Sequence, residues 1–419
     1  MKILVVGGGG REHAIVWKLS QSVKKPIIHC APGNGGIAAL ATCVPIKATD
    51  VPAMVDYAKK ERFDLVVVAP DDPLALGMVD ALEAAGIRAF GPNAAAARIE
   101  ASKVFAKDLM RKYGIPTAGY RVFTSPEAAL AHLRDCAYPT VVKADGLALG
   151  KGVIICKTHE DAKTAVQKIM VDKAFGASGA RVIVEDYIEG PEVSVLCFAD
   201  GTRLVPMVSS QDHKRAFDRD EGPNTGGMGT FAPTPKYTPA VEDEVTRTIL
   251  LPTIRAMAEE DAPFKGVLYF GLMLTGDGPR VLEYNARFGD PETQVVLPLL
   301  KTDLIDIMEA TIDGTLDGMD VEWEQGACVC VVIASGGYPG PYQKGYEITG
   351  LKALQGRDDI IVFHAGTQLK DGKTVTAGGR VLGVTAKAED IAGAREKAYA
   401  AVEDIRFTGA HYRRDIGNK

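Results

Sequence analysis

The feature that most restricts the fold is an alternation of short apolar segments with amphipathic segments over the first hundred residues. The apolar runs are KILVVG (2–7), PIIHCAP (26–32), DLVVVAP (64–70) and IRAFGP (87–92), and segments with helical periodicity separate them. Apolar strands that alternate with helices are typical of a parallel sheet covered on both faces. The sequence therefore predicts a parallel α/β domain over 1–100, with ligands bound beyond the carboxyl ends of its strands.

The first strand ends in a run of four glycines, Gly7 to Gly10. This run does not match the dinucleotide fingerprint G-x-G-x-x-G, because the sixth position falls on Glu12 or His13. The second strand also lacks the acidic residue that would bind a ribose, so NAD binding is disfavoured. A glycine turn at the start of a helix still suits a phosphate group, and a purely structural turn is the alternative.

Charge and composition exclude two classes of partner. The 419-residue chain has a net charge of −6 and a pI near 5.8, whereas nucleic-acid platforms usually have a basic footprint. No apolar run approaches the roughly 18 to 20 residues of a membrane span, and the amino terminus is typical of a first strand, not of a signal peptide. Seven scattered cysteines, an odd number, indicate reduced thiols. We therefore expect a cytoplasmic protein without nucleic-acid or membrane partners.

The stretch VLEYNARFGDPETQ (281–294) carries unusually many polar groups for the end of a strand. An apolar run and a Gly-Asp-Gly-Pro turn precede it, which predicts a hairpin. Because strand side chains alternate between faces, Glu283, Asn285 and Arg287 are expected on one face. Hard divalent cations such as Mg2+ take oxygen ligands, commonly one or two carboxylates plus substrate phosphates. The alternative is a solvated strand edge with a surface ion pair.

Two glycine-rich segments suggest loops that close over a ligand. The segment DGLALGKGV (145–153) fails as a Walker A loop, because the spacing is too short and Gly152 stands where Ser or Thr is needed. It lies between the predicted strands PTVVK and GVIIC, which favours a hairpin lid with Lys143 on its first strand. The second loop, EGPNTGGMGT (221–230), follows the polar run 209–220.

The remaining sequence predicts elements without obvious chemistry. These are a long amphipathic helix over 241–260, a hairpin at LKDGKTV (369–375) and a final helix near 389–404. Cys328 and Cys330 would share one strand face without a second Cys or His pair nearby. Core packing is therefore favoured over a metal site.

Together these motifs resemble the ATP-grasp ligases, and among them the phosphoribosylamine–glycine ligase (glycinamide ribonucleotide synthetase) family. The resemblance spans the whole chain and is carried by GGGGREHA, APGN, FGP, KADGLALGKGV, QDHKRAFDRDEGPNTGGMG, EYNARFGDPETQ, GGRVLGV and YRRDIG. It implies a multidomain α/β and α+β chain with an ATP-grasp fold. The expected segments are an N-terminal parallel α/β domain at 1–100, an ATP-grasp domain at 101–125 plus 190–325, a lid subdomain at 126–189 and a small mixed C-terminal domain at 326–419.

The resemblance also implies a division of roles among the candidate site residues. ATP would be bound by Lys103, Lys143, Gly150, Lys151, Gly152, Glu185, Tyr187 and Glu192, with Glu185 and Tyr187 at the adenine and Glu192 at the ribose. Glu283 and Asn285 would be the metal ligands. Arg287 would stabilise the transferring phosphoryl group. Asp212 and Lys214 would be catalytic residues that lie opposite the part of the site that receives phosphoribosylamine. The substrate set would be Gly8, Gly9, Gly10, Asn34, Asp71, Asp212, Lys214, Gly226, Gly227 and Arg287.

The activity implied is ATP-dependent ligation of glycine to 5-phosphoribosylamine in purine synthesis, with ATP as cosubstrate and Mg2+ or Mn2+ as metal. The sequence is compatible with a monomer and with a transient hand-over of the unstable amine from the enzyme that makes it. One departure concerns Ala69-Pro70-Asp71, where the family commonly has Gly-Pro-Glu. The shorter carboxylate of Asp71 puts its reach to a ribose hydroxyl in doubt.

Alternatives remain open at this point. The chain could be another ATP-grasp carboxylate–amine ligase or carboxylase, such as a biotin carboxylase, or a non-catalytic ATP-binding sensor. His213 is compatible with a general base, but a hydrogen-bonded spacer is favoured. Arg380, Arg413 and Arg414 could support ATP, a domain interface or only the surface.

Overall fold

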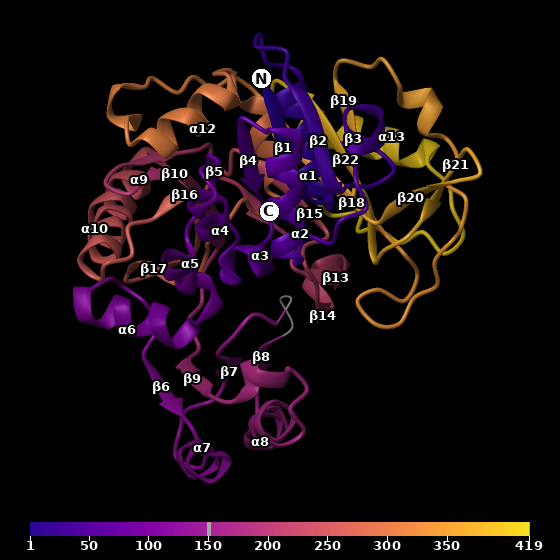
Figure 1. Ribbon diagram of the computed structural model, residues 1–419. Coiled ribbons are helices and arrows are strands. Elements are labelled where there is room, and N and C mark those ends of the chain that lie inside the picture. Colours follow the sequence, from indigo (N-terminus) through magenta and orange to yellow (C-terminus); the bar gives the residue numbers. More distant parts are fainter. Residues whose placement is uncertain (149–151, 419) are drawn as a thin grey trace.

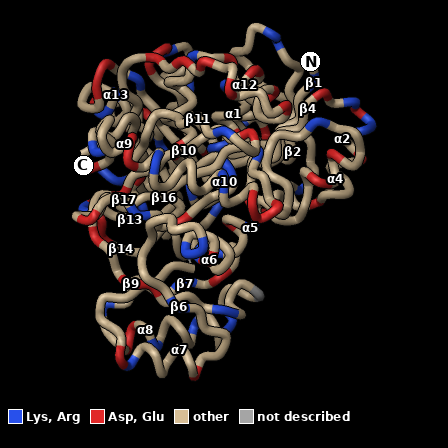
Figure 2. The backbone as a smooth tube through the Cα atoms, turned by 90° about the vertical axis from the view of Figure 1, so that its left-hand side faces the viewer, with Lys and Arg blue, Asp and Glu red and all other residues tan. Residues whose placement is uncertain are grey.

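The computed structural model describes residues 1–148 and 152–418. Within them, three of the four larger sheets form the body of the molecule, and the fourth belongs to a unit that projects from it (Figure 1). In Figure 2, lysines and arginines are interspersed with acidic residues over the whole backbone. The described residues include no helix long and apolar enough to cross a membrane.

The N-terminal segment forms the parallel sheet that the sequence predicts, in the order β3-β2-β1-β4-β5. Alternate residues of β1 face opposite layers: Ile3 and Val5 pack in the cluster that contains α1, whereas Leu4 and Val6 pack in the cluster that contains α2 and α4. The strands are β1 (Lys2–Gly7), β2 (Ile27–Pro32), β3 (Thr42–Cys43), β4 (Leu65–Val68) and β5 (Ala89–Phe90). The helices are α1 (Gly10–Ser20), α2 (Val51–Glu61), α3 (Asp71–Ala75), α4 (Met78–Ala84) and α5 (Ala94–Ala101).

The central sheet is antiparallel, in the order β11-β10-β16-β17, and it confirms the hairpin predicted before Asn285. Its strands are β10 (Glu192–Asp200), β11 (Leu204–Pro206), β16 (Lys265–Thr275) and β17 (Gly278–Asn285). The helices of this segment are α6 (Lys103–Tyr113), α9 (Pro239–Val245), α10 (Leu251–Glu259), α11 (Thr293–Val296) and α12 (Leu304–Asp313).

The helix predicted over 241–260 is a continuous run that contains a π-helical turn at Thr246–Leu250 between α9 and α10. Pro252 follows at the start of α10. Proline has no N–H to donate and its ring crowds the preceding turn. A single wider turn accommodates it without ending the helix.

The projecting unit at the bottom of Figure 1 is an antiparallel sheet in the order β6-β9-β7-β8 with two helices. It has its own small apolar core. Its elements are β6 (Tyr120–Phe123), α7 (Pro126–Leu133), β7 (Thr140–Ala144), β8 (Val153–Cys156), α8 (His159–Val166) and β9 (Val182–Asp186). Strands β7 and β8 pair as the predicted hairpin around the glycine-rich loop.

The last sheet, in the order β12-β15-β18-β22-β19, joins parts of the chain that are far apart in sequence. Two of its strands come from the segment before residue 325, so the sheet crosses the predicted boundary at 326. Its strands are β12 (Gln211–Asp212), β15 (Gly229–Ala232), β18 (Ala327–Ala334), β19 (Ile360–His364) and β22 (Arg380–Ala388). Beside it lie β13 (Arg215–Phe217), β14 (Glu221–Asn224), β20 (Thr367–Lys370), β21 (Lys373–Thr376) and α13 (Ile391–Asp404). We keep the four-segment division as a proposal.

The predicted C-terminal features agree with the structure. Strands β20 and β21 form the predicted hairpin, and α13 is the predicted final helix. All seven cysteines are free thiols. Cys328 and Cys330 are completely buried in β18, which confirms their core role.

Two buried histidines join the N-terminal and C-terminal segments. The backbone N–H of His364 in β19 donates to Nδ1 of His13 in α1 at 2.7 Å, and the two rings meet edge to face. Burial, with His364 nearby, lowers the pKa of His13 from 6.5 to about 3, and burial lowers that of His364 to about 4. Both imidazoles are therefore neutral in the folded protein.

This contact predicts a loss of stability in mild acid. Below pH 6.5 the unfolded chain protonates both histidines while the folded chain does not. Folding stability is therefore fully present above pH 6.5 and falls as the pH falls toward 4, by about 1.4 kcal/mol per pH unit for each histidine. In urea titrations between pH 7 and pH 5, His13→Gln should keep an acceptor for the His364 N–H and show a smaller pH slope than wild type. Equal slopes would contradict the assignment.

Candidate active site

A cavity of about 930 Å3 lies where the projecting unit meets the rest of the molecule. Its walls come from every segment of the chain. Thirteen of the residues predicted for the site line it: Asp71, Lys103, Lys143, Gly152, Glu185, Tyr187, Glu192, Asp212, Lys214, Gly226, Glu283, Asn285 and Arg287. Segments far apart in the sequence, from Asp71 to Arg287, therefore contribute to one site.

The end of β17 supplies the acid, amide and guanidinium singled out in the sequence. Glu283, Asn285 and Arg287 all line the cavity. Tyr284 also borders it, but its hydroxyl lies within hydrogen-bonding distance of Thr253 in the core. Burial raises the pKa of Glu283, but the neighbouring lysines and Arg287 outweigh it and leave the pKa below its ordinary value. Glu283 is therefore an anion surrounded by cations.

A buried carboxylate in β9 holds two lysines beside the cavity. Glu185 Oε2 lies 2.9 Å from Nζ of Lys143 and 3.1 Å from Nζ of Lys107, and all three side chains are at least 93% buried. The second oxygen of Glu185 has no hydrogen-bond partner in the described residues. Burial lowers the pKa of Lys107 to about 8. The pairing keeps two positive charges in a desolvated wall.

Lys103 is a third cation of this wall. Its Nζ donates to the Gly146 carbonyl at 3.1 Å, at the start of the glycine-rich loop. Burial lowers its pKa, and Glu283 partly offsets this. Together with Lys143, Lys103 makes this part of the cavity suited to polyanionic ligands.

Lys214 and Asp212 face the same cavity from the opposite side. Nζ of Lys214 lies 2.7 Å from Glu192 and 3.9 Å from Glu283. Burial lowers the pKa of Lys214, but the carboxylates around it outweigh burial and hold it well above its ordinary value. Burial, together with carboxylates that include Glu292, raises the pKa of Asp212 to about 8 despite the opposing effect of Lys214.

His213 is enclosed between them and does not line the cavity. Its side chain is completely buried, its Nδ1 lies 3.3 Å from the Gly229 carbonyl, and its ring packs near Phe231. This arrangement favours the spacer interpretation over the general base.

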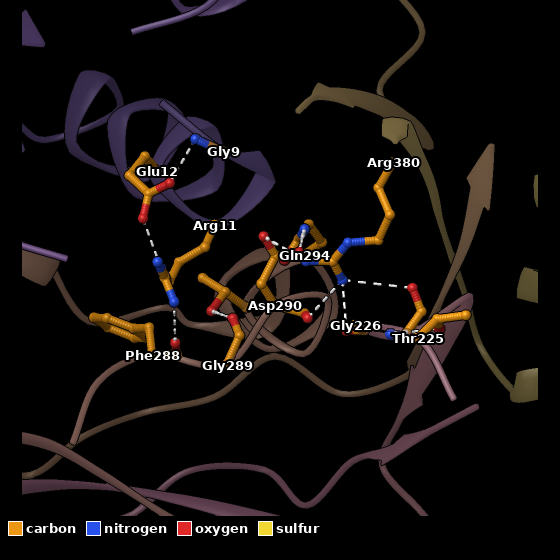
Figure 3. A network of polar contacts seen from close by, with 12 residues as sticks. Gly9, Arg11, Glu12, Thr225, Gly226, Phe288, Gly289, Asp290, Gln294 and Arg380 are labelled. Atoms are coloured by element: carbon orange, nitrogen blue, oxygen red, sulfur yellow. Dashed lines mark hydrogen bonds and ion pairs between the residues drawn. The ribbon is translucent and has the colours of Figure 1, made fainter. Parts of the chain in front are cut away.

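The four-glycine turn does not reach the cavity, because Gly8, Gly9 and Gly10 are not among the residues that line it. Figure 3 shows Gly9 next to Glu12 at the start of α1. The N–H of Gly9 donates to Glu12 at 2.6 Å, and Asp290 accepts hydrogen bonds from the backbone of Arg11 and from Gln294. The chain's own carboxylates therefore occupy the amino terminus of α1. A Cβ on Gly8 would lie 2.4 Å from the Gly33 carbonyl oxygen, so the close approach of these two loops requires glycine there.

Asn34 is likewise engaged by the protein. Its amide nitrogen donates to the carbonyls of Gly8 at 3.0 Å and His364 at 2.7 Å, and its oxygen accepts from Gly36 and Ile37. It does not line the cavity. The side chain joins the loops that follow the parallel strands β1 and β2 to the end of the antiparallel strand β19.

Arg380 of β22 connects the C-terminal sheet to two loops at the cavity (Figure 3). Its Nη1 donates to the carbonyl of Gly226 at 2.6 Å and to that of Asp290 at 2.7 Å. Nη2 lies 3.3 Å from the Asp290 carboxylate. Gly227 stands next to this contact without lining the cavity; a Cβ there would lie 2.5 Å from Pro291. Arg380 is therefore an interface residue that also faces the cavity.

The other two C-terminal arginines have different environments. Arg413 is completely buried and pairs with Asp220 and Asp415. The backbone N–H of Arg414 donates to Asp218 at 2.7 Å. Both contacts tie the end of the chain to the β13–β14 hairpin.

Two candidates, Gly150 and Lys151, lie outside the described residues. The structure also adds cavity residues that the sequence did not single out for the site: Arg11, Glu100, Lys107, Tyr269, Asp290 and Glu292. Arg11, Glu100 and Lys107 lie in helices, where a charged residue ordinarily faces solvent. Their burial depends on packing between segments of the chain, and no local sequence pattern predicts that packing.

The donor set fits a divalent cation that also binds a ligand. Glu283 and Asn285 offer two oxygen donors on one strand end. Across the described ranges, no group of three or more His, Cys, Asp or Glu side chains could hold an ion by itself. A cation of the Mg2+ type, which uses few protein carboxylates and completes its shell with phosphate oxygens, matches this set.

Comparison with known proteins identifies the family of the chain. Family models for the N, ATP-grasp (A) and C domains of phosphoribosylglycinamide synthetase match residues 1–100, 101–293 and 328–419. A phosphoribosylamine–glycine ligase from Caldanaerobacter subterraneus subsp. tengcongensis is 50% identical over 416 residues, covering 99% of both chains.

Solved structures agree. That of a phosphoribosylamine–glycine ligase from Thermotoga maritima superposes with a TM-score of 0.87 at 34% identity, covering 99% of this chain and all of the other. A biotin carboxylase from Campylobacter jejuni, at 16% identity, has a TM-score of 0.76 and covers 98% of this chain and 92% of its own; this likeness shows the shared fold alone. The chain therefore belongs to the phosphoribosylglycinamide synthetase family and has its ATP-grasp fold.

Proposed function

We propose that this chain ligates glycine to 5-phosphoribosylamine at the expense of ATP, giving glycinamide ribonucleotide, ADP and phosphate. The observation that carries the proposal is the strand end of Glu283, Asn285 and Arg287, which shares a cavity with Lys103, Lys143 and Lys214. Lysines that can bind a polyanion, oxygen donors for a cation and the Arg287 guanidinium beside them suit phosphoryl transfer to a carboxylate. Membership of the family supports the same activity.

The reaction would run in two displacements. A carboxylate oxygen of glycine attacks the γ-phosphorus of ATP in line, and the bond between the γ-phosphorus and the bridging β-phosphate oxygen breaks. The products of this step are ADP and glycyl phosphate. The amine nitrogen of phosphoribosylamine then attacks the acyl carbon, phosphate departs, and the nitrogen loses one proton. Neither displacement needs a side-chain nucleophile. Positioning and charge stabilisation dominate such transfers.

The residues of the cavity would bind different parts of ATP according to their charge. Lys103 and Lys143 would neutralise the triphosphate below the loop that contains Gly150, Lys151 and Gly152. Glu185 and Tyr187 would bind the adenine, and Glu192 the ribose. Arg287 would stabilise the negative charge that develops on the transferring phosphoryl group.

The amine would approach from the wall that carries Asp71, Asp212 and Lys214. Because the pKa of Asp212 is raised to about 8, its carboxyl is suited to exchange the proton that the attacking nitrogen loses. Gly226 and Gly227 would allow backbone contact with the substrate, while Gly8, Gly9, Gly10 and Asn34 would support the wall from behind.

Glu283 and Asn285 would hold the divalent cation. When bound, Mg2+ or Mn2+ would neutralise phosphate charge and orient the phosphate oxygens. The donors are carboxylate and amide oxygens, a set that suits Mg2+ and Mn2+ alike.

We also expect a cytoplasmic enzyme, since its seven cysteines are free thiols. One chain supplies every wall of the cavity, so a monomer suffices. Direct delivery of the unstable amine by the enzyme that makes it is compatible with this arrangement.

The substrates are tested by ADP release with Mg-ATP, glycine and phosphoribosylamine generated in situ, leaving out one component at a time. Turnover should require both glycine and the amine. ADP release with formate or bicarbonate in place of glycine would identify a different ATP-grasp enzyme. ATP binding without turnover on any acid would identify a sensor.

Arg287→Ala should lower kcat by about 100- to 1,000-fold, because a preorganised donor to the transition state is lost. Nucleotide affinity, measured by calorimetric titration, should change little. A variant with normal turnover would remove Arg287 from the mechanism.

Glu283→Gln should raise the Mg2+ concentration for half-maximal turnover by about tenfold or more, because a neutral amide replaces an anionic ligand. The matched control is Glu322→Gln, an exposed carboxylate outside the cavity. Equal Mg2+ dependence of both variants would argue against Glu283 as a ligand.

A further inference from the structure

Arg287 follows the end of β17, so strand pairing does not fix the direction of its side chain. Its hydrogen bonds within this loop go to neutral acceptors: the Phe288 carbonyl at 3.2 Å from Nη1 and the Asn285 amide oxygen at 3.3 Å from Nη2. Both distances are long for hydrogen bonds of this type. The Asn285 oxygen would also be needed by the cation. The loop alone therefore holds the guanidinium weakly.

Glu100 supplies the strong contact from a different part of the chain. It lies in α5, at the end of the N-terminal segment, with a side chain that is 7% exposed. Its Oε1 lies 2.9 Å from Nη2 of Arg287, and its Oε2 accepts the backbone N–H of Ala286 at 2.6 Å. One buried carboxylate thus fixes the guanidinium and the backbone just before it. Charge-assisted bonds of this kind are shorter and stronger than neutral ones.

Two other carboxylates compete for Arg287. Asp71 and Glu292, like Glu100, favour its charged form, although the ion pair is made with Glu100. All three line the cavity. A guanidinium on a flexible side chain could turn toward any of them. The partner that binds it decides where in the cavity its positive charge lies.

We propose that Glu100 is a positioning residue for phosphoryl transfer: it holds Arg287 toward the strand end that carries Glu283 and Asn285 and away from Asp71 and Glu292. The inference rests on the proposed function. The position of the Arg287 guanidinium then depends on the packing of α5 against β17, two elements from different segments of the chain.

The first test is Glu100→Gln, which keeps the size of the side chain and an acceptor for Ala286 but removes the charge. The kcat should fall about 10- to 100-fold, as for a misplaced catalytic group, while the KM for ATP stays within about threefold. The matched control is Asp200→Asn. Asp200 is a buried carboxylate that also accepts backbone N–H groups, those of Thr202, Arg203 and Leu316, and it does not line the cavity. The kcat of the Asp200→Asn variant should stay at the wild-type value.

A double-mutant cycle separates positioning from general damage. If Glu100 acts through Arg287, then Glu100→Gln should cost little further kcat in the Arg287→Ala background. Free guanidinium should partly restore turnover to Arg287→Ala, and Glu100→Gln in that background should weaken this rescue. A wild-type kcat for Glu100→Gln, or the same loss with and without Arg287, would overturn the inference.

If Glu100→Gln does not fold, Glu100→Asp replaces it. The shorter carboxylate keeps the charge but cannot reach both partners, so its kcat should fall, and a wild-type kcat would overturn the inference. Failure of the proposed function has a different signature, since the wild-type chain would then release no ADP with glycine and the amine. An active wild type with an unimpaired Glu100→Gln overturns only the role of Glu100.

Discussion

The structure depends on keeping many positive charges in one largely buried cavity before any phosphate is present. Five of them are paired with carboxylates: Lys107 and Lys143 with Glu185, Lys214 with Glu192, Arg287 with Glu100 and Arg380 with Asp290. An unpaired buried cation would be strongly destabilising. The carboxylates therefore allow the chain to fold around a site intended for a polyanion, and they also fix where each cation points.

These ion pairs tie the segments to one another. Glu100 of α5 reaches the strand end of the central sheet, and Arg380 of the C-terminal sheet reaches the loops that carry Gly226 and Asp290. The neutral contact between His13 and His364 joins the outer two segments behind the wall. The central, N-terminal and C-terminal parts thus form one frame, from which the β6–β9 unit projects (Figures 1 and 2). That unit brings Lys143 and Glu185 to the cavity through the pairing of β7 with β9.

Much of the fold could be predicted from local patterns. The apolar runs of β1, β2 and β4 predicted a parallel sheet, and the turns at Gly276–Gly278 and Asp371–Gly372 predicted hairpins that the structure confirms. The two-residue strands β3 and β12 were not predictable, because so short a segment has no periodicity. The pairing of β15 with β18 could not be predicted either, because nearly a hundred residues separate the two strands and both are simply buried, with no local pattern that matches one to the other.

The sequence alone determined which chemical groups are available and much of the local structure that carries them. Alternation along a strand brings Glu283 and Asn285 to one face, and the motif residues identify the ATP-grasp ligases because their types and spacing are local properties of the chain. Tertiary structure decided which groups meet. Glu100 and Lys107 have no recognisable role in the sequence, and Arg380 was open to a role at ATP, at a domain interface or only at the surface. Only packing between segments desolvates these three side chains and gives each a partner. Packing also turned the glycine turn at α1 toward the protein's own Glu12 and Asp290, because a helix amino terminus attracts whichever anion the fold brings to it.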